Sequence, residues 1–473
     1  MNNNESFNSG DSFLELQKHF FENPYPAIQE RIKGLKKLRS NIIRFREDIV
    51  EALRMDFSKP AFESDSSEIL VCLREIHLAI KNIKYWAQNQ NVDSDLLLLG
   101  SSSYIRYEPK GVVLIISPWN YPINLSLSPL ISAYAAGNKI ILKPSELTPY
   151  ISIVIQKIID ESFERNEVIV IQGDGIVSAE LSSLPFNHVF FTGSGFIAKK
   201  ILQAASVNLT PVTLELGGKC PVIIDRNFDL QKAVKHIAFA KLLNAGQTCI
   251  APDFVCLHQS HLDEFVYLWD QNLSRSYGDD ILHNSDYCGI INKNHLTRLT
   301  NIYNASIEDG AIACNKFEVE YSKLKMKPVL LKNVLWDNSI MSEEIFGPLL
   351  PLIIYESIED LCVELNKKDR PLNVYLFTNN SKLKEQVISK TRSGGITINQ
   401  CLLNYIDHNL PFGGDHQSGM GRSQGVFGFK EFSHERSITQ QSILPSTLQL
   451  FYPPYSKIKL LIKSLLLKIY SSL

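Results

Sequence analysis

The N-terminal part of the chain repeats its apolar positions at the spacing of an α-helix. Within residues 12–90, apolar side chains recur every three or four positions, beginning with Ile28 and Ile32, and a further helix is predicted over Ser67–Gln88. We expect this helical leader to pack against a sheet. Asn91–Tyr107 then becomes polar and irregular before it alternates, which predicts a short hairpin or a linker.

Strand-like and helix-like stretches alternate from Gly111 to about residue 217. Each short apolar run is followed by a stretch with helical spacing. This alternation predicts a parallel, doubly wound sheet, and such sheets bind ligands beyond the carboxyl ends of their strands. The predicted strands are Val112–Ile116, Lys139–Leu142, Val168–Ile171 and His188–Phe191, and the predicted helices are Leu125–Ala136, Tyr150–Glu164 and Ile197–Ala205.

A second alternation of the same kind follows Pro221 and predicts a second α/β domain. The boundary falls near Leu216–Pro221, and a cleft between two domains is a common place for a binding pocket. The predicted strands are Val222–Ile224, Phe254–Leu257, Val329–Leu331, Leu352–Tyr355, Val374–Phe377 and Gly395–Ile398, and the predicted helices are Leu230–Leu243, Leu262–Arg275 and Ser381–Lys390.

Composition and charge narrow the class of protein. A chain of 473 residues with 44% hydrophobic and 21% charged residues is typical of a folded protein with more than one domain. A net charge of −2 argues against a nucleic-acid partner. The eight cysteines form no CxxC pair, which argues against a metal site or a disulfide scaffold. We find neither a secretory signal nor an apolar run long enough to span a membrane, so we expect a cytoplasmic protein.

Three residues offer the chemistry of acyl transfer. Cys249 follows Gly246-Gln247-Thr248, where a thiol between small and polar residues is a candidate nucleophile. Glu215 precedes a glycine pair, and Asn120 lies in the proline-bounded sequence PWNYP. A thiol, a carboxylate and an amide together supply a nucleophile, a base and an oxyanion donor. Taken singly, each also has a structural reading: a buried cysteine, an ion pair with Lys219 and a turn residue.

These three motifs, in this order, resemble those of the aldehyde dehydrogenase superfamily. The surrounding sequence is most similar to the class 3, fatty-aldehyde branch, from about Phe13 to Tyr455. The motifs that carry the resemblance are TPVTLELGGK (210–219), GQTCIAPD (246–253), EEIFGPLLP (343–351), LPFGG (410–414), SGMGR (418–422), FSHERS (432–437) and YPPY (452–455).

The resemblance implies an α/β, aldehyde dehydrogenase-like fold. A Rossmann-type cofactor domain with its helical leader would comprise residues 1–90 and 108–217, and a second α/β catalytic domain residues 218–400. Residues 91–107 and 401–450 would form a small oligomerisation arm and substrate-side loops, and the implied assembly is a homodimer. Residues 451–473 would be a basic amphipathic tail.

The implied reaction is NAD(P)-dependent oxidation of aldehydes to carboxylic acids. The substrates would be aliphatic aldehydes of medium or long chain, with aromatic ones also within range. Cys249 would attack the carbonyl carbon while Asn120 and the Cys249 N–H hold the oxyanion, and Glu215 would activate the water that hydrolyses the thioester. Glu344 is a second candidate base, ranked below Glu215. Two alternatives stay open: a CoA-linked acylating dehydrogenase or acyl reductase, and a catalytically silent binding protein on the same fold.

The resemblance also assigns residues to the cofactor. Lys143 and Glu146 would bind the adenosine ribose, and the Glu146 carboxylate would favour NAD over NADP without excluding NADP. Gly193-Ser194 would open a helix toward the pyrophosphate, although Ala198 replaces the second glycine of the family motif. Glu344, Phe346 and Trp119 would hold the nicotinamide end. As bare sequence, these stretches equally suit ordinary turns and helix ends.

Two segments near the C-terminus, residues 408–417 and 451–473, lead to further expectations. His408, before LPFGG, is expected to shape the substrate channel or to stabilise the loop rather than to transfer a proton. Asp415-His416-Gln417 departs from the small residues usual in the family. The tail Phe451–Leu473 has no acidic residue, four lysines (457, 459, 463 and 468) and an apolar stripe. That pattern favours an interfacial membrane helix or a helix docked on its own domain or on a partner subunit.

Overall fold

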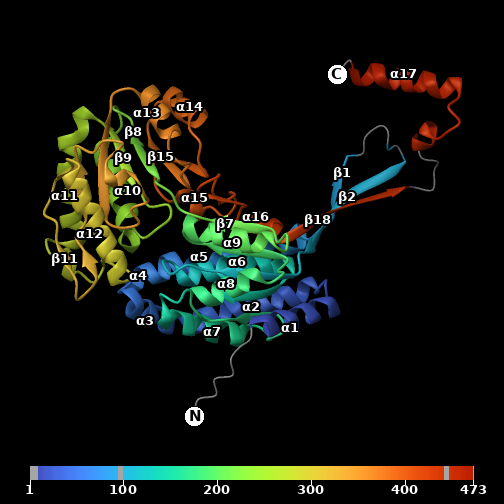
Figure 1. Cartoon of the computed structure of the whole chain (residues 1–473), viewed down its shortest axis with the longest axis horizontal. Coiled ribbons are helices and arrows are strands. Elements are labelled where there is room, and N and C mark those ends of the chain that lie inside the picture. The colour runs from blue at the N-terminus through green and yellow to red at the C-terminus, as the bar shows by residue number, and fades with distance from the viewer. Residues whose placement is uncertain (1–8, 94–97, 99, 442–446, 472–473) are drawn as a thin grey trace, which may run out of the picture.

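The computed structural model describes residues 9–93, 98, 100–441 and 447–471. Its N-terminal leader is helical, as predicted, and lies along the first sheet (Figure 1). The helix predicted from Ser67 begins at Leu70, because the preceding turn is wound more widely, with i→i+5 hydrogen bonds. The leader comprises α1 (Ser9–Glu22), α2 (Ile28–Arg44), α3 (Arg46–Phe57), α4 (Ala61–Ser64), the π-helical turn η1 (Asp65–Ile69) and α5 (Leu70–Trp86).

The first sheet has the strand order β17-β7-β6-β3-β4-β5. All neighbouring pairs are parallel except β17 with β7. The order reverses between β3 and β6, which makes the switch point where doubly wound sheets bind ligands. Its strands are β3 (Val112–Ile116), β4 (Lys139–Lys143), β5 (Val168–Val170), β6 (His188–Thr192), β7 (Val212–Glu215) and β17 (Gly419–Met420), and its helices are α6 (Pro122–Ala136), α7 (Pro149–Ser162), α8 (Gly175–Ser183) and α9 (Gly195–Ser206).

Alternate residues of β3 face two separate cores. Val113 and Ile115 are buried in the core that contains α6, whereas Val112 and Leu114 are buried against Phe13 of α1. Because a strand presents successive side chains to opposite faces, helices on both sides are needed to bury such a continuous apolar run. This explains why the apolar runs were sufficient to predict these strands.

The second sheet has the order β10-β13-β14-β9-β8-β15-β16, and all its neighbouring pairs except β10 with β13 are parallel. It contains all six strands predicted after Pro221. The strands are β8 (Pro221–Ile224), β9 (Phe254–His258), β10 (Ile312–Ala313), β13 (Val329–Lys332), β14 (Leu349–Tyr355), β15 (Asn373–Phe377) and β16 (Gly395–Ile398). The helices are α10 (Leu230–Leu242), η3 (Leu243–Gly246), η4 (Gln259–His261), α11 (Leu262–Tyr277), η5 (Ile281–His283), α12 (Lys293–Glu308), η6 (Ser339–Met341), α13 (Ile358–Asn366) and α14 (Ser381–Lys390), and β11 (Val319–Glu320) pairs with β12 (Lys325–Met326).

A three-stranded arm projects from the two sheets (Figure 1). β2 (Ser101–Pro109) is its central strand, with β1 (Gln90–Val92) and β18 (Ser433–Gln441) on either side. β18 runs antiparallel to β2 from Ser433 opposite Pro109 to Gln441 opposite Ser101. Two short helices, α15 (Leu403–Ile406) and α16 (Gly425–Glu431), precede β18.

The described C-terminal residues form η7 (Thr447–Phe451) and α17 (Lys457–Ser471). α17 lies beyond the arm, away from both large sheets (Figure 1), and none of its described residues is buried. Its apolar side chains are open to solvent, including Ile458, Leu461 and Leu465. Within the described residues, every helix is too short or too polar to cross a membrane.

Candidate active site

A tight turn after α10 carries Cys249. Asn244, Ala245 and Gly246 have φ angles of 54°, 52° and 78°, three successive left-handed residues. A Cβ on Gly246 would overlap the carbonyl oxygen of Gly347, so only glycine fits where these two backbones meet. The buried Gln247 side chain then donates to the carbonyls of Asn244 (3.0 Å) and Gly289 (2.9 Å). The turn is therefore fixed on both sides before the chain reaches the thiol.

The structure brings Asn120 to this same turn. Asn120 is buried, and its Nδ2 donates to the carbonyl oxygen of Gln247 at 3.0 Å. The neighbouring Tyr121 hydroxyl shares a 2.7 Å hydrogen bond with the Thr248 hydroxyl. An amide nitrogen carries two hydrogens, so Asn120 keeps a second donor. The motifs PWNYP and GQTC are thus joined by direct contacts.

Glu215 ends β7 with its carboxylate buried. One oxygen, Oε1, accepts a hydrogen bond from the Ser423 hydroxyl at 3.0 Å, whereas Oε2 has no hydrogen-bond partner in the described part of the chain. Burial raises the pKa of Glu215 to about 8. Lys219, its alternative partner, instead pairs with Asp253 and donates to the Ile340 carbonyl at 2.8 Å.

Two cavities meet at Cys249. One, of about 40 Å³, is lined by both Cys249 and Glu215, together with Ser423. The other, of about 210 Å³, is lined by Cys249 and mainly by apolar and aromatic side chains from the leader, α6, α10 and the segment around α15. The side chains that make this second cavity apolar are Val71, Tyr121, Leu125, Phe239, Leu243, Ile250, Leu402, Tyr405 and Ile406.

The surroundings of Cys249 favour the protonated thiol. Burial raises the pKa of Cys249 well above its usual range, and the carboxylates of Glu344 and Glu215 raise it further. Burial also raises the pKa of Glu344 to about 8. Its carboxylate lies against Gly217, where a Cβ would overlap it. Two proton-accepting carboxylates therefore flank a thiol that needs a base.

The residues expected at the cofactor fall into two groups. Lys143, which ends β4, is buried, and its Nζ donates to Glu146 at 2.7 Å. Ser194 caps α9 by accepting from the Ile197 N–H. A Cβ on Gly193 would overlap the Phe191 ring, whereas the space around Gly195 is open. An open, glycine-flanked helix start beyond a parallel strand fits a dinucleotide phosphate.

Trp119 and Phe346 form the second group. Their ring centres lie 5.4 Å apart in an edge-to-face arrangement, and His295 lies 5.2 Å from Trp119. Phe346 follows Glu344 on a backbone that Arg298 holds by donating to the Ile345 carbonyl at 2.6 Å. Trp119, His295 and Phe346 thus form an aromatic cluster, in which Phe346 is two residues along the chain from Glu344. This cluster suits the nicotinamide end of a dinucleotide.

The departures from the family pattern have local explanations. Ala198 is buried in the core between α9 and the sheet. Asp415 accepts two hydrogen bonds from Arg370 Nη1, at 2.9 and 3.0 Å. His408 is buried, and its Nδ1 lies 2.8 Å from the Glu75 carboxylate. Since His408 does not line the apolar cavity, these contacts make it a support for the adjacent loop.

Sequence reasoning missed several residues of this site. Ser423 directly follows the recognised motif SGMGR, and that position was the available signal. Asp253 ends the motif GQTCIAPD and accepts from the Ile345 N–H at 2.9 Å. No local pattern marks His295 or Arg298, because their roles arise from the packing of α12 on the EIFGP segment.

The chain is similar to known aldehyde dehydrogenases along most of its length. The family model described as "Aldehyde dehydrogenase family" matches residues 24–438. The 4,4'-diaponeurosporen-aldehyde dehydrogenase of Staphylococcus aureus is 42% identical over 94% of this chain and 96% of its own length. Aldehyde dehydrogenase family 3 member H1 of Arabidopsis thaliana is 37% identical over 95% and 93%, respectively.

Solved structures of aldehyde dehydrogenases also superpose on most of this chain. The structure titled "Substrate bound state of Staphylococcus Aureus AldH" superposes with a TM-score of 0.92 at 39% identity, and covers 97% of this chain and 99% of its own. An NAD+ complex of an aldehyde dehydrogenase from Bacillus cereus superposes with a TM-score of 0.82 at 26% identity, over 92% and 89% of the two chains.

The fold and these matches define an oxidoreductase of the α/β class with two sheets. The chain belongs to the aldehyde dehydrogenase family, and its most similar relatives include family 3 members. It is an NAD(P)-dependent aldehyde dehydrogenase, which oxidises aldehydes to carboxylic acids.

Proposed function

We propose that the protein oxidises medium- and long-chain apolar aldehydes through a thioester on Cys249. The observation that carries this proposal is the 210 Å³ apolar cavity that reaches the thiol. Its lining offers an alkyl or aryl chain a continuous apolar surface, whose burial contributes about 0.8 kcal/mol per methylene group. A short polar aldehyde would gain little there. The aldehyde carbon would therefore be delivered to Cys249 with its chain along Val71, Phe239 and Ile406.

The first step is the attack of the Cys249 sulfur on the carbonyl carbon. Because burial keeps this thiol protonated, the proton must leave as the S–C bond forms, and Glu215 or Glu344 can take it. The developing oxyanion accepts hydrogen bonds from the Asn120 amide and the Cys249 N–H. One such donor contributes about 3 to 4 kcal/mol to transition-state stabilisation. NAD(P), when bound, accepts the hydride that the adduct must lose to become the thioester.

The water that hydrolyses the thioester would occupy the smaller of the two cavities. A cavity of about 40 Å³ exceeds the minimum of about 10 to 15 Å³ that holds one water molecule, and Glu215 Oε2 provides an acceptor there. Glu215 in its charged form takes a proton from this water, which attacks the carbonyl carbon, and Cys249 leaves as the thiol. Its pKa of about 8 lets it accept and release protons near neutral pH. We therefore rank Glu215 above Glu344 as the hydrolytic base.

The cofactor residues follow from the two groups described above. Lys143 and Glu146 would bind the adenosine ribose, and Gly193 and Ser194 the pyrophosphate. Trp119, Glu344 and Phe346 would hold the nicotinamide end. The Glu146 carboxylate repels a 2′-phosphate, which favours NAD over NADP.

The deciding experiment measures reduced-cofactor formation with a straight-chain aldehyde series, with NAD and with NADP. Wild type should turn over with kcat/KM rising with chain length until the cavity is filled, and faster with NAD. The Cys249→Ala variant should be inactive, whereas Cys256→Ala, which removes a buried strand thiol, should stay active. Silence of wild type with every aldehyde would contradict the proposal. Acyl transfer to CoA would favour the acylating alternative.

We further propose a homodimer assembled through the arm of β1, β2 and β18, and surface contact of α17 with membranes. The arm projects from the two large sheets, and most residues of β18 are exposed, so the arm is accessible to a second subunit. α17 combines four lysines of the tail with exposed apolar side chains, the pattern of an interfacial helix. The measurements that test both are given in the Discussion.

A further inference from the structure

A buried ion pair in the helical leader lies close to the proposed oxyanion site. Lys59 Nζ is 2.6 Å from Glu68 Oε1, and both side chains are completely buried, with 0% exposure. Removing two charges from water is costly unless their contacts are well arranged, so a fully buried pair needs an explanation. Neither residue lines the cavities that reach Cys249. The other contacts of Lys59 and Glu68 supply the explanation.

Glu68 caps the helix that follows Asn120. Its second oxygen, Oε2, accepts the N–H groups of Ile123 (3.1 Å) and Asn124 (2.9 Å), which are near the start of α6. The residue at the cap position of α6, Tyr121, makes no side-chain cap of its own. A carboxylate is the favoured partner of a helix N-terminus, because the N–H groups there are unpaired. Glu68 thus fixes the chain just after Asn120.

Lys59 contacts the same short segment. Its Nζ lies 3.5 Å from the Asn120 carbonyl oxygen and 4.1 Å from the centre of the Tyr121 ring. That carbonyl also accepts from Asn244 Nδ2 at 3.0 Å. The backbone of Asn120 is therefore held by the leader on one side and by the nucleophile turn on the other.

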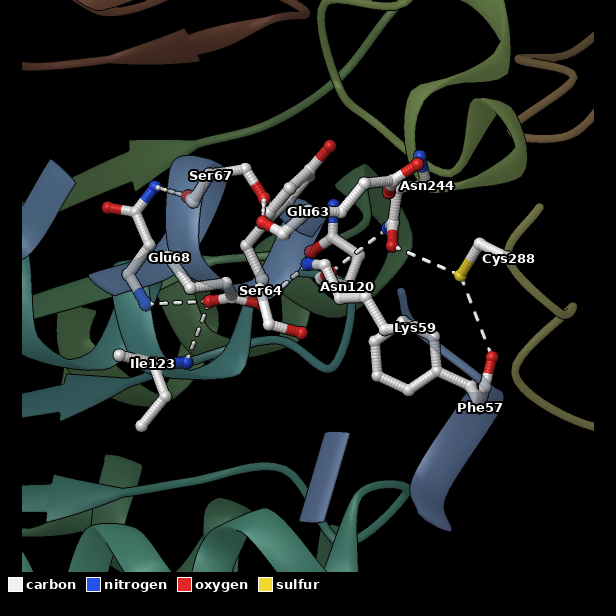
Figure 2. A network of polar contacts seen from close by, with 12 residues as sticks. Phe57, Lys59, Glu63, Ser64, Ser67, Glu68, Asn120, Ile123, Asn244 and Cys288 are labelled. Atoms are coloured by element: carbon white, nitrogen blue, oxygen red, sulfur yellow. Dashed lines mark hydrogen bonds and ion pairs between the residues drawn. The ribbon is translucent and has the colours of Figure 1, made fainter. Parts of the chain in front are cut away.

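Glu63 extends these contacts to the turn that carries Cys249. Its Oε2 accepts the N–H of Asn244 at 2.9 Å, where the three left-handed residues begin. Asn244 Nδ2 and Asn120 Nδ2 both donate to the Gln247 carbonyl, at 3.2 and 3.0 Å. Figure 2 shows Lys59, Glu63 and Glu68 gathered around Asn120 and Asn244.

The π-helical turn η1 explains why one short segment reaches both places. Glu63 and Glu68 are five residues apart, and this spacing would place them on different faces of an α-helix. In η1 the hydrogen bonds run from i to i+5, as from the Leu70 N–H to the Asp65 carbonyl. The wider turn lets one short segment place the Glu63 carboxylate on the Asn244 N–H and the Glu68 carboxylate on the Ile123 N–H (Figure 2).

We infer that Lys59, Glu63 and Glu68 are positioning residues that hold the Asn120 amide in register with the Cys249 N–H. The inference rests on the proposed covalent mechanism, in which these two donors bind one oxyanion. The three residues do not touch the aldehyde. They act through Asn120 and the turn at Asn244, so their removal should slow the chemical step and leave aldehyde binding nearly unchanged.

A double-mutant cycle tests this in the full chain. The variant Lys59→Met/Glu68→Gln removes both members of the ion pair, so neither of the two is left charged without its partner. It should lower kcat about 10- to 100-fold with a straight-chain aldehyde and NAD, because small misplacement of an oxyanion donor has effects of this size, with KM changed less than about threefold. In the Asn120→Ala background the same pair should cost less than about threefold, because the group it positions is gone. The matched control is Arg54→Met/Glu51→Gln, an exposed pair in α3 of the same leader.

A second pair of variants gives an independent test, including the case in which the first variant does not fold. Glu63→Ala removes the acceptor for the Asn244 N–H, whereas Glu63→Gln keeps an oxygen there and should restore most of kcat. Equal losses in the Asn120 and Asn120→Ala backgrounds, or no rescue by glutamine, would overturn the inference and leave a general structural role.

The two proposals can fail separately. Hydrolysis of 4-nitrophenyl acetate needs the thiol and the oxyanion donors but no cofactor, so the cycle can also be measured on this ester. A wild type that is active on the ester and silent on aldehydes would overturn only the proposed function, and the ester cycle would still decide the inference. Silence toward both substrates would overturn both.

Discussion

Glu215 shows how one hydrogen bond tunes a buried base. Burial disfavours its charged form and raises its pKa to about 8, while the Ser423 hydroxyl favours the charged form and lowers that pKa. The acid form dominates below pH 8, so hydrolysis of the thioester should rise with pH and level off above it. Ser423 therefore decides how much of the base is available at neutral pH.

Replacing Ser423 with alanine should move this pH dependence to higher pH. A hydrogen bond to a charged group contributes about 1.5 kcal/mol, and one pKa unit corresponds to about 1.4 kcal/mol, so we expect a displacement of about one pH unit. The measurement is the rate of thioester hydrolysis at each pH, observed after rapid mixing of the enzyme with an aldehyde and cofactor. At pH 7 the variant should hydrolyse its thioester several times more slowly than wild type.

Two further variants make this test specific. Ser433→Ala removes a buried hydroxyl of the same C-terminal segment, which donates to the Phe429 carbonyl at 2.7 Å, and the pH profile of this variant should match that of wild type. Glu215→Gln should accumulate the thioester and lose the pH dependence assigned to this carboxyl. An unchanged profile in Ser423→Ala would contradict the assigned role of the hydroxyl.

At the scale of elements, the nucleophile turn and the EIFGP segment fit together through two glycines. Gly246 has a φ of 78°, and its α-carbon faces the Gly347 carbonyl so closely that a methyl group would overlap it. The Lys241 carbonyl lies on another side, 3.0 Å from the same Cβ position. The thiol-bearing turn is thus pressed directly against the segment that holds Glu344.

The Gly246→Ala variant should lose stability and activity together. Alanine with a positive φ costs about 1 to 2 kcal/mol, and overpacking against fixed backbone adds about 1 to 3 kcal/mol. Gly310→Ala is the control, because Gly310 has a φ of 95° with open space around its Cβ position. Urea unfolding should show a loss of unfolding free energy for Gly246→Ala that exceeds the Gly310→Ala loss by about 2 kcal/mol. Equal losses would show that the contact with Gly347 is unimportant.

The strands of the two large sheets that were predicted correctly bury both faces. Val112–Ile116 is a continuous apolar run because helices cover the sheet on both sides. Such a run predicts a buried strand. β18 was missed because most of its residues are exposed and its sequence, SHERSITQQ, is polar except for Ile438. β7 was also missed, because its four residues, VTLE, are too few to form a clear apolar run.

Only the residues of the candidate site that lie within recognisable sequence motifs could be predicted. Cys249, Asn120 and Glu215 lie in recognisable stretches, whereas Lys59 and Glu68 read as surface residues, because charged side chains are seldom fully buried. The N–H groups of α6 that Glu68 accepts from, and the Asn120 carbonyl near Lys59, are more than fifty residues away in sequence. No local pattern could connect them.

At the scale of the whole molecule, the arm and α17 extend away from the two large sheets. The polar arm pairs nine residues of β18 with β2, yet it covers no active-site cavity of its own chain. α17 buries none of its described residues. A helix whose apolar side chains remain in water needs another surface, and four lysines of the tail favour an anionic one.

Liposome flotation tests this expectation. The full chain should float with vesicles of anionic phospholipid, and a chain that ends at Tyr455 should remain in solution. A variant with glutamine at Lys457, Lys459, Lys463 and Lys468 keeps the apolar residues and should bind much more weakly, since each lysine near an anionic surface contributes about 1 kcal/mol. Equal flotation of the full and shortened chains would contradict membrane contact. Light scattering should give a dimer for both, because both retain the arm.

The surroundings of Cys249, which favour the protonated thiol, should also slow the oxidation of this thiol by peroxides. Peroxides attack thiolates, and a thiol whose pKa is raised by burial and by two neighbouring carboxylates presents very little thiolate. The resting protein should therefore keep its nucleophile in the reduced form where exposed low-pKa cysteines are converted to sulfenic acid. The same burial that makes the thiol depend on a base thus preserves it until an aldehyde arrives.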